Sequence, residues 1–276
     1  MNKLVSIILT TIERPTLLQK CLNSVITNWP TSVRCILLIG NQNDYDSESY
    51  SVISKIIENN PEKDIRHYDL EYDCGISQAR NELIHKSLLH NADYILLSAD
   101  SILFNESMKD IDNLLPCLQK SDRPEWSYYD LIGLQLNNRI EWEAKLNLIP
   151  NQSFELDFIE KNSKEGVWIV GDKVFNVWDC DIARNFWIAR TESLLKVPYD
   201  EQLIMCEHED FFWRAKEKNL VVGCTNLCSS TYNKGENPPE YDKIRTTNFR
   251  IGQQRLKDKY SLKGWVSYKH MERIKP

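Results

Sequence analysis

The amino-acid sequence predicts an α/β fold with a mixed, mostly parallel sheet flanked by helices. In the N-terminal third, short apolar runs alternate with amphipathic stretches, a pattern typical of βαβ units. The chain has 276 residues, of which 42% are hydrophobic, enough for one large domain with a buried core. A charged fraction of 27% is that of an ordinary globular protein, so extensive disorder is excluded.

The N-terminal third predicts four strands and three helices in alternation. Strands are predicted at short, mostly apolar runs, namely Leu4–Thr10, Cys35–Ile39, Ile65–Leu70 and Tyr94–Ser98. Helices are predicted where apolar residues recur every three to four positions, at Pro15–Val25, Tyr50–Glu58 and Ser77–Leu89. Because such sheets bind ligands at the carboxyl ends of their strands, the loops after the strands are the first candidates for chemistry.

The rest of the chain is less regular and rich in tryptophan between residues 121 and 180. Its clearest predicted elements are helices at 105–120, Glu207–Lys218 and Tyr241–Lys259, and a strand at Val221–Cys224. The segment after residue 235 is strongly charged, which predicts a helix with a solvated face.

Charge and cysteine content narrow the class of protein. The chain has 40 Asp and Glu residues against 34 Lys and Arg residues. This net charge of −6 argues against a protein that coats nucleic acid non-specifically. The eight cysteines include no CxxC motif, which favours free thiols in a reducing cytoplasm over a zinc site. The N-terminal apolar run is too short for a signal peptide, and no stretch reaches the ~18 apolar residues of a membrane span.

Polar residues that follow the predicted strands are candidate ligand contacts. Thr10 and Thr11 can offer hydroxyls to a base or ribose, and Arg14 can meet a phosphate. Arg80 lies in the first turn of the helix after Gly75, where a helix N-terminus and a guanidinium together favour an anion. The alternative for each is a helix cap or a solvated surface charge.

Asp100 stands at the end of the fourth predicted strand, between two apolar runs. A carboxylate there is costly unless it is paired or bound to a metal ion. Mg²⁺ and Mn²⁺ are commonly held by one or two carboxylates together with substrate phosphates, so Asp100 is a candidate metal ligand. The alternative is an Asp that only caps the loop.

Further acids occur at Asp181 and at the start of the predicted helix Glu207–Lys218. Acids such as Glu209 and Asp210 at a helix N-terminus often only complement the helix dipole. Held in a cleft, such a carboxylate can instead be the general base for a hydroxyl nucleophile.

Taken in order, these elements resemble the inverting glycosyltransferases of the GT-A fold, of the broad family 2 type. Within that family they are most similar to the β-1,4-N-acetylgalactosaminyltransferase group that includes ganglioside GM2 synthase. The matching segments are Thr10–Arg14, Gly75–Asn81, Ser98–Ser101, Asp181–Arg190 with its NFWIART motif, and His208–Phe212 (HEDFF). The resemblance spans roughly residues 4–234, and each motif is weak alone.

The resemblance implies a GT-A domain over residues 1–235, followed by a charged C-terminal extension, expected to be helical, over 236–276. Residues 1–104 would form the nucleotide-binding half and residues 105–235 the acceptor half. The implied donor-binding residues are Thr10, Thr11, Arg14, Asn41, Asp44, Arg80, Asp100 and Asp181. Asp210 would be the catalytic base, with Glu209 as its nearest rival, and Asp100 would hold a Mn²⁺ or Mg²⁺ ion.

The sequence also departs from the family pattern. Relatives carry two or three acids at the strand end, whereas this chain has Asp100 alone, and the segment Leu227–Lys234 lacks the histidine that completes many metal sites. In the loop after the second strand, Asn41 or Asp44 would have to recognise the base of the donor nucleotide. A cation such as Arg80 or Lys234 would then share the neutralisation of the phosphates.

The sequence therefore predicts a cytoplasmic enzyme, bacterial or viral, that moves a hexose or pentose from a nucleotide sugar to an acceptor hydroxyl with inversion. A UDP-sugar is the favoured donor, and a glycan is the expected acceptor. One alternative is a phage-type transferase that glycosylates hydroxymethylated DNA bases, favoured by the Lys- and Arg-rich segment 243–275. Another is a non-catalytic sugar-nucleotide-binding module, favoured by the missing acids. A nucleotidyltransferase is a poorer match, since it usually needs two metal-binding acids.

Overall fold

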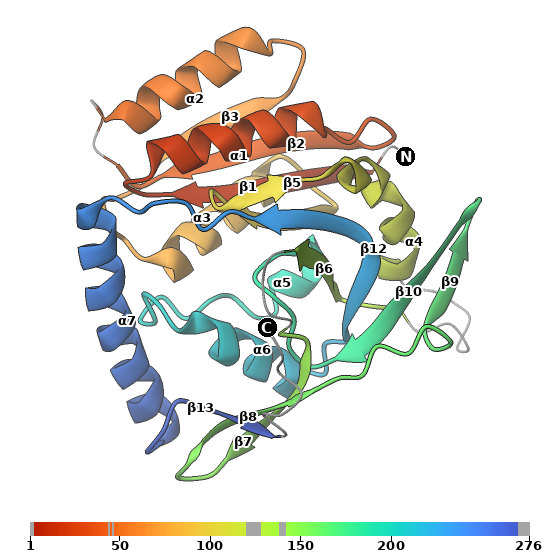
Figure 1. The fold of residues 1–276 in the computed structure, drawn as a ribbon, viewed down its shortest axis with the longest axis vertical. Coiled ribbons are helices and arrows are strands. Elements are labelled where there is room, and N and C mark those ends of the chain that lie inside the picture. Colours follow the sequence, from red (N-terminus) through yellow and green to blue (C-terminus); the bar gives the residue numbers. More distant parts are fainter. Residues whose placement is uncertain (1–2, 44, 46, 120–127, 138–141, 270–276) are drawn as a thin grey trace.

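A computed structural model describes residues 3–43, 45, 47–119, 128–137 and 142–269 (Figure 1). Its strands are β1 (Leu4–Thr11), β2 (Arg34–Asn41), β3 (Ile65–Asp69), β4 (Tyr94–Ala99), β5 (Ile102–Phe104), β6 (Leu131–Asn137), β7 (Ala144–Ile149), β8 (Ser153–Phe158), β9 (Val167–Val170), β10 (Lys173–Cys180), β11 (Trp187–Arg190), β12 (Val222–Tyr232) and β13 (Val266–Lys269). Its helices are α1 (Pro15–Thr27), α2 (Glu48–Asn59), α3 (Ile76–Leu89), α4 (Leu115–Leu118), α5 (Thr191–Leu194), α6 (Glu207–Glu217) and α7 (Pro239–Tyr260), with a 3-10 helix, η1, at Glu106–Leu114.

A mixed central sheet confirms the predicted α/β class. Its ten strands follow the order β3-β2-β1-β4-β11-β6-β12-β10-β9, and β5 pairs with β12 at the side. The strands β1 to β4 are all parallel, as the alternating strand and helix pattern predicts. A second sheet of three strands has the order β13-β8-β7.

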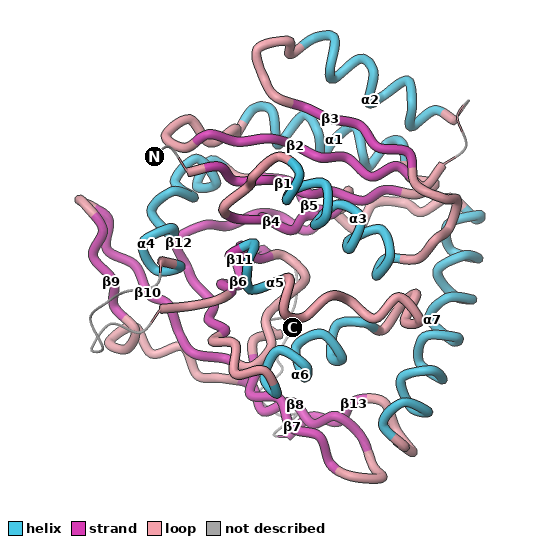
Figure 2. Tube along the Cα trace, turned by 180° about the vertical axis from the view of Figure 1, so that it is seen from behind, coloured by secondary structure: helices cyan, strands magenta, loops and turns pink. Residues whose placement is uncertain are grey.

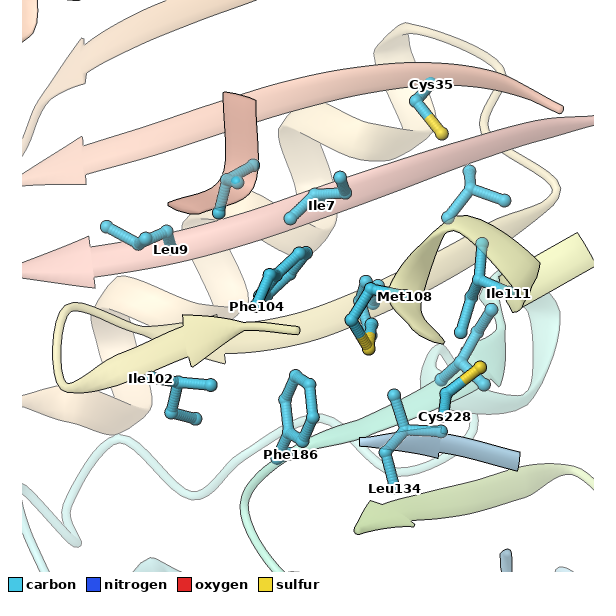
Figure 3. Close-up of a cluster of buried hydrophobic side chains, with 14 of the residues drawn as sticks. Ile7, Leu9, Cys35, Ile102, Phe104, Met108, Ile111, Leu134, Phe186 and Cys228 are labelled. Carbon is cyan, nitrogen blue, oxygen red and sulfur yellow. The ribbon is translucent and has the colours of Figure 1, made fainter. Parts of the chain in front are cut away.

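Helices cover both faces of the parallel part of the sheet. Successive residues of β1 point to opposite faces, so Ile7 and Leu9 pack in one hydrophobic cluster and Ile8 in the other. The first cluster lies under α1 and α2, and Figure 3 shows Ile7 and Leu9 facing Phe104 and Met108 in it. The second lies under α3, which Figure 2 shows on the rear face. The mainly apolar sequence of β1, in which Ser6 is the one polar residue before the two terminal threonines, thus follows from its burial on both sides.

Two predicted elements differ from the structure. The helix predicted for residues 105–120 is instead the 3-10 helix η1 followed by the short α4, because Pro116 has no N–H with which to continue an α-helical ladder. The strand predicted for Val221–Cys224 continues to Tyr232 as β12. Its polar second half is held by backbone pairing with β5 and β6, which apolar patterning does not report.

The C-terminal segment packs against the rest of the domain. Helix α7 runs beside α6 along one side of the molecule, and β13 then pairs with β8 (Figure 1). Asn248 Nδ2 donates to Asp73, and Arg255 Nη1 donates to the Gln202 carbonyl oxygen. Segment 236–276, predicted as an extension, thus contributes a helix that is bonded to the loop before α3 and to the loop before α6. None of the helices in the described ranges is long and apolar enough to cross a membrane.

Close packing of α7 depends on Gly252. A Cβ atom at this position would overlap the Met205 carbonyl oxygen in the loop before α6. Helix propensity alone would make Gly252→Ala stabilising by about 1 kcal/mol. We expect the opposite sign, a loss of about 1–3 kcal/mol in the free energy of unfolding, because the overlap forces α7 outward. Denaturant unfolding measures the change, with Thr247→Ala on the exposed face of α7 as the control. A more stable Gly252→Ala protein would contradict this packing.

Candidate active site

Two adjoining cavities lie at the carboxyl ends of β1 and β4. The smaller, of about 100 Å³, is walled by the loops after these strands and by α7. The larger, of about 290 Å³, extends to the N-terminus of α6. Both are lined by Arg14, Tyr241 and Arg245, so one elongated ligand can span them. This is the edge of the sheet at which α/β folds bind ligands.

Four sequence-predicted residues meet at the wall of these cavities. Parallel pairing places Thr10 beside Ala99, so the ends of β1 and β4 come together. Asp100 is 1% exposed and accepts hydrogen bonds from Thr11 Oγ1 at 3.0 Å and Arg14 Nε at 3.2 Å. A second bond, from Arg14 Nη2, completes an ion pair. Burial raises the pKa of Asp100 above its ordinary value, although Arg14 and Thr11 act in the opposite direction.

The residues at this strand end do not fit a divalent metal ion. Mg²⁺ and Mn²⁺ need free carboxylate oxygens, usually from more than one acid or with substrate phosphates added. Both oxygens of Asp100 already accept hydrogen bonds from Arg14 or Thr11. In the part of the chain that the structure describes, no group of three His, Cys, Asp or Glu residues is placed to hold a metal ion. The metal-binding role predicted for Asp100 thus conflicts with its pairing to Arg14.

Arg80 is a buried, paired cation. Its side chain is 3% exposed, and its Nη1 lies 2.5 Å from Oε1 of Glu207 at the start of α6. The guanidinium also stacks over the ring of Tyr199, 5.0 Å from the ring centre, and Asn185 Nδ2 donates to the same Glu207 oxygen. Arg80 therefore lines the larger cavity as part of a neutral pair that joins α3 to α6.

Glu209 lies in the wall of the larger cavity. The side chain is 1% exposed, and burial raises its pKa to about 8, with nearby Glu207 and Asp210 adding to the effect and the backbone N–H and the Trp265 indole opposing it. Its Oε2 atom has no hydrogen-bond partner among the described residues. A carboxyl group with a pKa close to working pH is suited to general base catalysis.

Asp210, the predicted base, faces away from the cavities. It is fully buried, and Arg214 Nη2 and Lys259 Nζ lie 2.7 and 2.5 Å from its two oxygens. Tyr260 Oη donates a further hydrogen bond at 2.8 Å. Successive helix residues point about 100° apart, so α6 turns Glu209 toward the cavity and Asp210 toward α7.

The other predicted donor contacts are not brought to this site. Among the described residues, Asn41 and Asp181 lie outside the walls of both cavities. Asn41 is fully buried beneath the loop after β2, and its neighbour Gln42 lines the smaller cavity instead. Asp181 forms ion pairs with Lys216 at 2.7 Å and Lys145 at 3.9 Å. Asp44 lies outside the described residues.

Helix α7 supplies wall residues that sequence reasoning missed. Tyr241 and Arg245 line both cavities, and Asn248 lines the smaller one. Their spacing of four and three residues places them on one helix face, a pattern visible in the sequence. The high charge of the segment predicts a helix exposed to solvent, and this prediction takes no account of the spacing of the three wall residues. Lys234, the other cation proposed from the sequence, is exposed and outside both walls.

Another cavity, of about 780 Å³, lies between β9, β10 and the segment around Glu160. It contains none of the sequence-predicted residues and is remote from the ends of the parallel strands. The two adjoining cavities at the ends of β1 and β4 are therefore the candidate site, because strand ends, buried charges and the titrating Glu209 converge there.

Comparison with known proteins gives structural neighbours only. No protein-family model matches the chain, and no curated protein sequence matches it. S. aureus TarS, residues 1–349, is similar with a TM-score of 0.56 and 12% identity, over 94% of this chain and 72% of that one. The same TarS fragment has been solved in complex with UDP-GlcNAc.

Two further solved structures share the fold. GalNAc-T7 with UDP, GalNAc and Mn²⁺ gives a TM-score of 0.61 at 12% identity, over 93% of this chain and 49% of that one. The Pyrobaculum calidifontis mannosyltransferase PcManGT, with GDP-Man and Mn²⁺, gives 0.54 at 10% identity, over 91% and 63%. Identities this low establish architecture rather than activity. With its mixed sheet and its cavities at the strand ends, the chain has the GT-A glycosyltransferase fold.

Proposed function

We propose that the protein transfers a sugar from a nucleotide-sugar donor to an acceptor hydroxyl, with inversion at the anomeric carbon. The observation that carries this proposal is the pair of joined cavities, with Arg14 and Arg245 in both walls and Glu209 in the larger one. Glycosyl transfer needs a stabilised diphosphate leaving group and a base for the acceptor hydroxyl. This site offers a candidate for each.

Glu209 is the proposed general base. The acceptor oxygen attacks the anomeric carbon while its proton passes to the Glu209 carboxylate. The bond from that carbon to the phosphate oxygen breaks, and its electron pair leaves with the nucleoside diphosphate. One such displacement inverts the centre. Retention by double displacement would need a carboxylate nucleophile, and the other acid of the larger cavity, Glu207, is held by Arg80.

A UDP-linked hexose is the favoured donor. The TarS complex with UDP-GlcNAc and the GalNAc-T7 complex with UDP and GalNAc support it, although PcManGT was solved with GDP-Man. Membership of the ganglioside GM2 synthase-like group stays a prediction from the sequence. The eight cysteines are all free, seven of them buried, which supports the predicted reducing, cytoplasmic setting.

A glycan hydroxyl is the proposed acceptor, in glycan biosynthesis. The rival acceptor, a modified DNA base, was suggested by the basic C-terminal segment. Several of its cations bond within the chain instead: Arg255 to Gln202, Lys259 to Asp210 and Lys269 to Asp157. Such internal pairing leaves fewer charges for a polyanion.

The proposal is tested by incubating the purified protein with UDP- and GDP-linked sugars and measuring release of the nucleoside diphosphate. We expect slow hydrolysis of at least one UDP-sugar, accelerated by a glycan acceptor but not by hydroxymethylated DNA. A donor that binds without any turnover would indicate the non-catalytic module. Failure of every donor to bind would overturn the proposed function.

A further inference from the structure

The wall shared by the two cavities carries two guanidinium groups, those of Arg14 and Arg245. In the described part of the chain, the acid at the strand end is Asp100 alone, and its carboxylate forms an ion pair with Arg14. The guanidinium therefore stands where a divalent cation would otherwise bind the carboxylate. Its Nη1 atom makes no hydrogen bond to a described residue, so it is available to a ligand.

Tyr241 of α7 holds two guanidinium groups together. Arg14 lies over its ring, 4.1 Å from the centre, and Arg245 Nη1 donates to its hydroxyl oxygen at 3.2 Å. Stacking on an aromatic ring fixes the plane of a guanidinium, so its donors point in defined directions. Both arginines line both cavities, and the exposed side chain of Arg245 has no ion pair with a described acid.

Arg245 forms no ion pair with a described acid, although Asp242, one turn earlier on α7, interacts with its charge at longer range. Asp100 is saturated by Arg14 and Thr11, and Asp73, the other acid on the smaller cavity, accepts a hydrogen bond from Asn248. Among the other cations of the larger cavity, Arg80 is paired with Glu207. A dianionic ligand between Arg14 and Arg245 would give Arg245 a direct ion-pair partner, and guanidinium groups bind phosphate oxygens through two parallel hydrogen bonds.

We propose that Arg14 and Arg245, positioned by Tyr241, bind the donor diphosphate in place of a metal ion. The inference rests on the proposed function and deepens it, because it assigns the group that stabilises the leaving diphosphate. It also makes α7 part of the donor site. The electron pair released when the anomeric bond breaks is then stabilised by two fixed guanidinium charges.

The test measures binding of UDP, GDP and UMP to the full chain by titration calorimetry, in EDTA and in Mn²⁺. We expect at least one diphosphate to bind equally well in both buffers. Arg245→Gln should weaken its binding by about 10- to 100-fold, while binding of UMP, which lacks the second phosphate, changes less. Arg250→Gln, an exposed change of equal charge on the same helix, is the control and should change neither.

Arg14→Lys serves as the second variant, because it keeps a charge beside Asp100 but removes the fork of donors. It should weaken diphosphate binding, while the remaining charge beside Asp100 keeps the protein folded. Binding that disappears in EDTA and is unaffected by Arg245→Gln would overturn the metal-free arrangement alone, with the transferase proposal intact. No binding of UDP or GDP in either buffer would instead overturn the proposed function.

Discussion

Replacing Glu209 with Gln is expected to lower kcat by about 10²- to 10⁴-fold while donor affinity stays nearly unchanged. The amide keeps the size and burial of the side chain but cannot take the acceptor proton. Single-turnover transfer and nucleotide titration separate the two effects. Glu217→Gln, an exposed change near the end of the same helix, is the matched control and should retain full turnover. If Glu207→Gln abolished transfer while Glu209→Gln did not, the base would be misassigned.

The same variant should change the pH dependence of both activity and stability. A base with a pKa of about 8 must lose its proton to work, so wild-type kcat should rise up to about pH 8 and then level off. Between the ordinary value of 4.5 and about 8, folded Glu209 keeps a proton that the unfolded chain has lost. The free energy of unfolding therefore falls as pH rises through this window.

Glu209→Gln removes that titration from the folded protein. Its melting temperature should match the wild type near pH 4 and exceed it near pH 8, while its activity stays low at every pH. A residue that weakens stability but serves turnover is the pattern expected of a buried catalytic group. An unchanged pH dependence of stability would show that Glu209 ionises normally.

Much of the nucleotide-binding half was predictable from the sequence. Strands such as β1 are buried on both faces, so a nearly continuous apolar run predicts them directly, and parallel pairing then places Thr11 and Asp100 together. What the sequence could not report is which way adjacent side chains turn. Glu209 and Asp210 are neighbours with the same chemistry, and only the cations on α6 and α7 decide which one is neutralised.

The role of α7 was hidden for a related reason. From the sequence alone, a charged helix with little apolar periodicity predicts a solvated surface element whose charges face an external partner. In the structure, Arg255 and Lys259 bond to the loops around α6, and Tyr241 faces the cavities. Charge composition predicts that such residues are near water, but the partner of each charge is a property of tertiary packing.

For Asp210→Asn we expect the opposite of Glu209→Gln, namely a large loss of stability with little loss of turnover. The carboxylate is fully buried between Arg214 and Lys259, so the amide leaves Arg214 without its counter-charge, while Lys259 keeps its ion pair with Asp200. Breaking a buried ion pair from one side costs about 3–5 kcal/mol, and the single amide oxygen can still accept the hydrogen bond of either Tyr260 or Arg214, which places this change near the lower figure. The melting temperature should then fall by roughly 6–12 °C.

Turnover of the Asp210→Asn protein, measured well below its melting temperature, should stay within about threefold of wild type, since the side chain does not line the cavities. Asp258→Asn, an exposed change on α7, is the control for loss of a charge and should shift neither property. Paired with Glu209→Gln, the measurement assigns each of two adjacent acids a separate role. A stable Asp210→Asn protein without transferase activity would return the catalytic role to Asp210 and would show that the ion pairs with α7 open when substrate binds.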